Sequence, residues 1–173
     1  DDWKTDSLWV HEPRPIRARE REQVIPDRVD PSMPTGQVLL DNVYIGRNMN
    51  GVEHGDIKKL LILETLPKPV NFSGDYAPMS FGGTFTLERV LGTVPVEEDG
   101  SANFELPAMR SIFFVALDEK NMSVKRMQSF MTVQPGERIS CIGCHENRGE
   151  APRSPQLTIA MRRPPSQITP LAE

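Results

Sequence analysis

The residues with the clearest chemical signature lie at positions 141–145, where the chain reads Cys-Ile-Gly-Cys-His. Two thiols separated by two residues can add to the two vinyl groups on one edge of a porphyrin. The histidine that follows then lies under the ring, where its imidazole reaches the iron. Gly143 is small enough to let the backbone approach the haem edge. The pattern therefore predicts one covalent haem c, attached to Cys141 and Cys144, with His145 as the proximal iron ligand.

Two other uses of the cysteine pair are weaker interpretations. A thioredoxin-like redox pair lies at a strand-to-helix junction of a βαβ unit, and the surrounding sequence is not of that kind. A zinc site needs further Cys or His ligands, and only His11 and His54 remain to complete a Cys2His2 set. With two cysteines three positions apart, the chain has no long-range disulfide of its own.

The sixth iron ligand decides what such a haem does. A second protein ligand gives an electron-transfer haem, whereas an open position lets the iron bind or activate a small molecule. Met127 and Met131 lie shortly before the motif and, four residues apart, face the same side of a strand. We take both as haem-contacting residues and Met127 as the candidate distal ligand. The alternative is that both fill the core, as methionine often does.

The middle of the chain predicts short β-strands that must position this motif. Strand candidates are residues 37–45, 57–65, 84–96, 102–106, 111–117 and 124–133. A hairpin-type turn is expected at Glu98-Asp99-Gly100. Strands of this length and spacing predict a mainly β fold, a small antiparallel β-sandwich or barrel, with a short helical segment for haem attachment.

Proline content divides the chain into three parts. The sequence has 16 prolines in 173 residues, concentrated toward both ends. We expect an extended N-terminal arm over residues 1–36 and a β-rich haem c domain over residues 37–150. A proline-rich tail over residues 151–173 is expected to pack on the domain. The first residues are not a signal peptide and include no initiator Met, so we expect a mature or excised part of a larger protein.

Charge and hydropathy exclude two classes of partner. The net charge is −4 and no basic stripe is present, so nucleic-acid binding is not expected. No run of 18 apolar residues occurs, so no membrane span is expected.

Three stretches resemble one known family. They are LGTVPVEEDGSANFELPA at 91–108, SIFFVALDEKN at 111–121 and RMQSFMTVQPGERISCIGCHE at 126–146. All three are similar to the middle, haem-bearing domain of hydrazine synthase alpha-subunit-like proteins, which are abundant in planctomycetes, and the resemblance extends over roughly residues 25–168.

This resemblance implies a β-rich domain with a covalent haem, inside a parent protein that often carries a β-propeller before it. It does not imply that this chain makes hydrazine. In hydrazine synthase a tyrosine shortly after the motif is associated with the haem iron. Here residues 146–150 contain no tyrosine, and Gly149 stands where that residue would be sought. The departure favours iron ligation by His145.

The sequence thus predicts a mono-haem c-type cytochrome domain that transfers single electrons to a redox partner protein, rather than an enzyme on its own. The alternative is a haem with an open or weakly held sixth position, as in a hydrazine-synthase-like enzyme subunit. A third interpretation, compatible with both, is an interaction module that packs against other domains of its parent protein. Because bacteria attach haem c outside the cytoplasm, we expect a periplasmic or otherwise exported protein.

Overall fold

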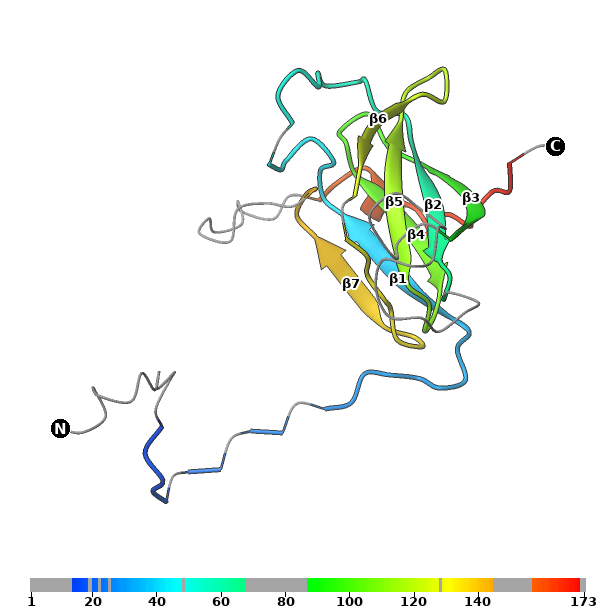
Figure 1. Ribbon diagram of the computed structural model, residues 1–173. Coiled ribbons are helices and arrows are strands. Elements are labelled where there is room, and N and C mark those ends of the chain that lie inside the picture. The colour runs from blue at the N-terminus through cyan, green and yellow to red at the C-terminus, as the bar shows by residue number, and fades with distance from the viewer. Residues whose placement is uncertain are drawn as a thin grey trace, which may run out of the picture.

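The computed structural model describes residues 14–18, 20–21, 23–24, 26–47, 49–67, 87–127, 129–144 and 157–171. These ranges contain seven strands and one short 3-10 helix, η2 (Figure 1). The elements are β1 Thr35–Leu40, β2 Lys59–Thr65, β3 Glu88–Pro95, β4 Ala102–Pro107, β5 Ile112–Leu117, β6 Ser123–Arg126, β7 Arg138–Cys141 and η2 Ala160–Arg162.

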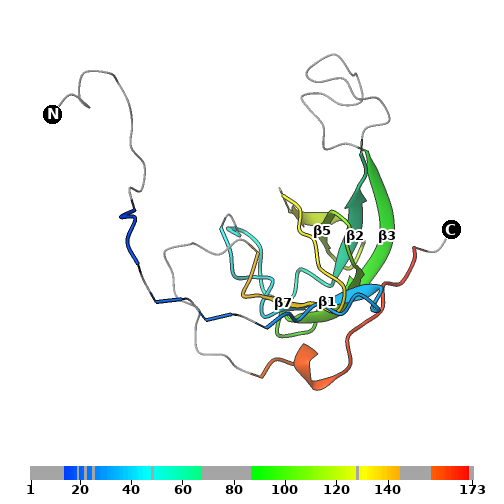
Figure 2. The ribbon, with the colours of Figure 1, turned by 90° about the horizontal axis from the view of Figure 1, so that it is seen from below.

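The strands form two sheets, which Figure 2 shows from below. One sheet has the order β4-β1-β7 and the other the order β3-β2-β5-β6. They pack as an open sandwich and do not close into a barrel. The mainly β sandwich predicted from the sequence is therefore confirmed, and the barrel alternative is wrong.

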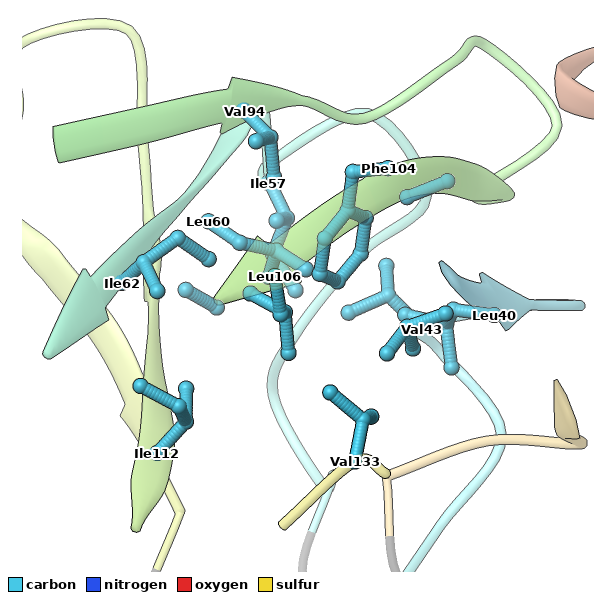
Figure 3. Packing of buried hydrophobic residues seen from close by; sticks show 13 residues of the cluster. Leu40, Val43, Ile57, Leu60, Ile62, Val94, Phe104, Leu106, Ile112 and Val133 are labelled. Carbon is cyan, nitrogen blue, oxygen red and sulfur yellow. The ribbon is translucent and has the colours of Figure 1, made fainter. Parts of the chain in front are cut away.

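The core between the sheets follows from the alternation of side chains along the strands. In β1, Val38 and Leu40 point inward, and in β2 Leu60 and Ile62 do the same. Phe104 of β4 is almost fully buried, and Figure 3 shows its ring inside this cluster. Burying a phenylalanine contributes about 1.5–3 kcal/mol, which makes Phe104 one of the larger single contributions to the fold.

The turn at residues 97–101 joins the two sheets. The Glu97 amide donates to the Ser101 carbonyl and the Gly100 amide to the Glu97 carbonyl, at 2.8 and 2.9 Å. Gly100 has a φ of 83°, which the turn requires and glycine adopts at little cost. A hairpin-type turn was expected here, but β3, which precedes the turn, and β4, which follows it, belong to different sheets. The segment is therefore a corner of the sandwich and not a hairpin.

β7 departs from the expected antiparallel pattern. It pairs with β1 in parallel, with Gln37 opposite Arg138 and Leu40 opposite Cys141. Gly136, at a φ of 69°, turns the chain immediately before β7 so that it runs in the direction of β1. The attachment segment was expected to be helical. Over its described part it is instead the end of β7 followed by a bend, with Cys141 as the last strand residue.

The described parts of the two ends behave differently. The described residues of the N-terminal arm up to Asp30 are exposed, and this part of the arm runs away from the sheets (Figure 1). Residues 157–171, here called the strap, lie along the sandwich. Ser166 of the strap bridges to Phe104 of β4, and Thr169 bridges to Thr93 of β3. The strap thus links the edge strands of the two sheets. No helix in the described ranges is long and apolar enough to cross a membrane.

Candidate functional site

The candidate site is a cavity of about 230 Å³ between the two sheets. It is here called the sulfur pocket, because four of its lining residues carry sulfur. The lining residues are Val38, Leu40, Leu60, Phe104, Phe114, Ala116, Lys125, Met127, Met131, Ser140, Cys141, Gly143 and Cys144. Most of this lining is apolar, so the pocket disfavours water and favours a flat hydrophobic ligand.

The sheet order explains where the pocket lies. At one side of the sandwich, β3 and β4 are joined by the corner turn and bridged by the strap. At the other side the edge strands are β6 and β7, and no strand pairing joins them in the described ranges. Residues from both of these edge strands line the pocket. The site therefore lies on the side of the sandwich between β6 and β7, here called the unbridged side.

Backbone hydrogen bonds hold the cysteine turn against the segment that follows β1. The Asp41 amide donates to the Cys141 carbonyl at 2.8 Å, and the Cys144 amide donates to the Ile45 carbonyl at 2.7 Å. Gly46 forms a parallel bridge to Cys144. Both cysteines are half-buried and neither forms a disulfide. The two thiols are thus fixed in position from both ends of the turn.

Two glycines allow this close approach. A Cβ at Gly143 would lie 2.1 Å from the Ile45 carbonyl oxygen, and a Cβ at Gly46 would lie 1.9 Å from the Cys144 carbonyl oxygen. Both distances are far below van der Waals contact. The sequence suggested that Gly143 admits a haem edge. The structure adds a requirement that sequence reasoning missed, namely the packing of the turn on residues 45–46.

The two methionines reach the same pocket by a route other than the expected one. β6 ends at Arg126, so Met127 and Met131 do not share the face of one strand. Instead, the Met127 amide donates to the Phe114 carbonyl at 2.9 Å, and Met131 exchanges two 2.8 Å backbone hydrogen bonds with Ile112. Both methionines are therefore fastened to β5, which brings their side chains to the sulfur pocket.

The structure thus gathers Cys141, Cys144, Met127 and Met131 around one cavity. His145, the fifth predicted residue, lies outside the described residues, as does His11. His54 lies against Tyr44, with ring centroids 4.8 Å apart, and does not line the pocket.

Sequence reasoning missed Lys125, the one charged side chain among the described residues of the pocket lining. It lies two residues before Met127, and alternate residues of an extended chain face the same side. This spacing is the signal that would have found it.

The donor chemistry of the pocket fits a covalent haem. Two thiols stand at a fixed spacing on one wall, and thioethers, aromatic rings and aliphatic side chains line most of the rest. The volume is smaller than the roughly 300–1,000 Å³ of ordinary ligand sites. A porphyrin held by the two cysteines must therefore extend beyond the cavity.

The fold and the pocket together define a small β-sandwich domain with a cysteine pair on its unbridged side. The sequence matches the family described as the hydrazine synthase alpha subunit middle domain over residues 55–146, more than half of the chain. The chain belongs to this family.

A solved structure of Kuenenia stuttgartiensis hydrazine synthase has a similar fold, with a TM-score of 0.63 and 22% sequence identity. The match covers 75% of this chain and 20% of that one, so the chain spans about a fifth of the solved protein. A search among curated proteins found no match.

Proposed function

We propose that this chain is a mono-haem c domain that passes single electrons to a redox partner, as one part of a larger exported protein. The observation that supports this most directly is the sulfur pocket, which places the cysteine pair of the attachment motif and two thioethers around one apolar cavity. Haem, when bound, supplies a one-electron iron couple.

The chain's own residues would hold and tune this group. Cys141 and Cys144 would form the two thioether links, and the motif spacing assigns His145 to the iron. Met127, or failing it Met131, would supply the distal sulfur, since thioether ligation raises the reduction potential of a haem. The apolar lining would exclude water from the iron, which favours the less charged, reduced state.

Membership of the hydrazine synthase alpha middle-domain family supports a place within a larger multi-domain subunit. The structural match, which covers only 20% of the solved chain, is consistent with this. Periplasmic or other export follows as part of the proposal, since bacteria attach haem c outside the cytoplasm.

A second candidate function rests on a different observation. A second cavity, of about 510 Å³, adjoins the sulfur pocket and shares Lys125 and Met127 with it. If Met127 does not ligate the iron, this cavity offers space for a small molecule next to that residue. The domain would then bind or activate a ligand, as part of a hydrazine-synthase-like enzyme subunit.

The deciding experiment is absorption spectroscopy of the chain expressed with a haem c maturation system. The pyridine haemochrome spectrum and the protein mass test for one covalent haem. A low-spin ferric spectrum with a far-red methionine band, unchanged by carbon monoxide in the ferrous state, supports electron transfer. A high-spin ferric spectrum with ready carbon monoxide binding supports the second function instead. The absence of covalent haem refutes both.

Single substitutions then identify the distal ligand. Met127→Leu and Met131→Leu each keep the apolar volume and remove the sulfur. The matched control is Met122→Leu, because Met122 is exposed and does not line the pocket. Loss of the far-red band in one pocket variant alone names the ligand. Retention of the band in both would place the ligand elsewhere.

A further inference from the structure

The sulfur pocket brings together four sulfur donors from two walls of the sandwich. Cys141 and Cys144 belong to the end of β7 and the turn after it, and Met127 and Met131 belong to the segment that follows β6. Among the described residues, neither a carboxylate nor a histidine lines this cavity. Sulfur is therefore the prevailing donor atom that the pocket offers to a ligand.

The two methionines occupy neighbouring inward positions beside β5. Met131 exchanges two backbone hydrogen bonds with Ile112. Met127 donates one to Phe114, as the β5–β6 register requires. Ile112 and Phe114 are two residues apart in β5, so they share one face of the sheet, and Ile112 belongs to the buried cluster of Figure 3. Residues paired across strands also share a face, so both methionine side chains point to the interior between the sheets.

The cysteines face the methionines from the other sheet. Cys141 lies opposite Leu40 in the parallel β1–β7 pair, and Leu40 is part of the buried core, so Cys141 points inward as well. Cys144 lines the same cavity and is held by the 2.7 Å hydrogen bond from its amide to the Ile45 carbonyl. Facing sheets lie roughly 10 Å apart, so a thiol from one wall and a longer thioether from the other can reach one atom between them.

Donors of this kind favour a soft metal ion. Thiolate and thioether sulfur together suit Cu(I). Zinc is normally held by cysteine, histidine and carboxylate ligands, and the described residues include no group of three or more such side chains that could hold a metal ion. Only two of the four sulfur donors would thus serve zinc, whereas all four serve Cu(I). The apolar lining also limits the access of water to the bound ion.

We propose that the chain without haem binds one Cu(I) ion in the sulfur pocket, through the thiolates of Cys141 and Cys144 and the thioethers of Met127 and Met131. Binding releases the two thiol protons and leaves the copper as Cu(I), so no electron is transferred. This metal site goes beyond the proposed haem function. The two occupants exclude each other, because covalent haem attachment consumes both thiols.

The test titrates the full chain, expressed without haem, with Cu(I) under anaerobic conditions in competition with the chromophoric chelator bicinchoninate. The wild-type chain should withdraw one equivalent of Cu(I) from the chelator, and the bound ion should protect both thiols from alkylation. Replacing both thiols, in Cys141→Ser combined with Cys144→Ser, should abolish the withdrawal of copper. Unchanged withdrawal by that variant would overturn the proposal.

Met127→Leu and Met131→Leu test the two thioethers. Each substitution keeps the apolar volume and should weaken Cu(I) binding by at least about tenfold, since even the loss of an outer-shell partner costs about 10- to 100-fold in metal affinity. The matched control is Met122→Leu, because Met122 is exposed and does not line the cavity, and its Cu(I) affinity should equal that of the wild type. Equal affinity in both pocket variants and the wild type would refute the four-sulfur site.

A parallel titration with Zn²⁺ separates ligation from a structural effect of the methionines. Because zinc does not use thioether sulfur, Met127→Leu and Met131→Leu should leave its affinity within about threefold of the wild type. If a methionine substitution weakens Zn²⁺ and Cu(I) by the same factor, that methionine only supports the cysteine turn and the proposal is wrong.

The copper site and the haem function fail independently. Covalent haem in the wild-type chain, after expression with a maturation system, judges the haem function alone. The chain that carries covalent haem should no longer withdraw Cu(I) from the chelator, and undiminished Cu(I) binding by it would place the copper elsewhere. Whether or not haem attaches, the titration of the chain without haem decides the copper site.

Discussion

Replacing Gly46 by alanine should displace Cys144 and with it one of the two proposed haem attachment points. The backbone φ of Gly46 lies outside the left-handed region, so alanine is not disfavoured by local conformation. The obstacle is contact, because the added Cβ would lie 1.9 Å from the Cys144 carbonyl oxygen and 2.7 Å from its carbonyl carbon. Both are backbone atoms, which cannot rotate away as a side chain can. The two segments must therefore separate by about 1 Å to reach an acceptable contact.

The energetic cost follows from what that separation breaks. Inserting a methyl group into a packed contact costs about 1–3 kcal/mol. The 2.7 Å hydrogen bond from the Cys144 amide to the Ile45 carbonyl would lengthen or break, at a net cost of about 0.5–1.5 kcal/mol. Gly46→Ala should thus lower the free energy of unfolding by roughly 2–4 kcal/mol, which leaves a domain of ordinary stability folded but weakened.

The assay combines urea denaturation with thiol alkylation of the chain without haem. Gly46→Ala should lower the denaturation midpoint and raise the alkylation rate of Cys144 more than that of Cys141. Gly51→Ala is the control, because a Cβ at Gly51 meets nothing within 4 Å. Its φ of 82° costs stability by backbone strain alone, and it should leave thiol reactivity unchanged. Unaltered stability and unaltered Cys144 alkylation in Gly46→Ala would refute the claim that this contact positions the thiol.

Three further substitutions test how the sandwich supports the pocket. Asn103→Ala removes amide hydrogen bonds of 3.2 and 3.3 Å to two strap carbonyls and should cost about 1–3 kcal/mol in urea denaturation, with faster proteolysis of the strap. Phe104→Ala empties a core position that also lines the pocket, and calorimetry should show a loss of about 3–5 kcal/mol. Asp99→Asn tests acid stability. Partial burial raises the pKa of Asp99, but hydrogen bonds from the Ile159 amide and from Ser101 outweigh burial and lower it below its ordinary 3.8. The carboxylate therefore stabilises the fold above about pH 4 and loses this effect as the pH falls through the lowered pKa. The difference in melting temperature between wild type and Asp99→Asn should shrink over that range, and a constant difference would contradict it.

The hydrophobic pattern of the sequence predicted the strands that contain several apolar residues close together in the chain. The run at 111–117 became β5, and the segment at 57–65 became β2. The motif at 141–145 was recognisable because its spacing is that of the haem attachment pattern and does not depend on the fold. Strands and motifs that depend only on neighbouring residues in the sequence could thus be predicted from the sequence alone.

β7 was missed for the opposite reason. It has four residues, Arg138–Cys141, of which only Ile139 and Cys141 pack partly against the core, so its hydrophobic pattern is too short to identify a strand. Its strand character comes from pairing with β1, about a hundred residues earlier in the chain. The parallel direction of that pair depends on the turn at Gly136, and the strap depends on bridges to Phe104 and Thr93. Such pairings are non-local, and periodicity within one segment cannot reveal them.

The placement of the site also has a non-local cause, which connects the strap to the pocket. A two-sheet sandwich has two sides at which its edge strands meet, and a large flat ligand can enter only at a side that backbone does not cross. Here the β3–β4 side is crossed twice, by the corner turn and by the strap. The β6–β7 side instead presents side chains, with sulfur atoms from both walls and one lysine. Among the described residues no strand pairing joins the edge strands of this second side, and the cysteine turn lies on it.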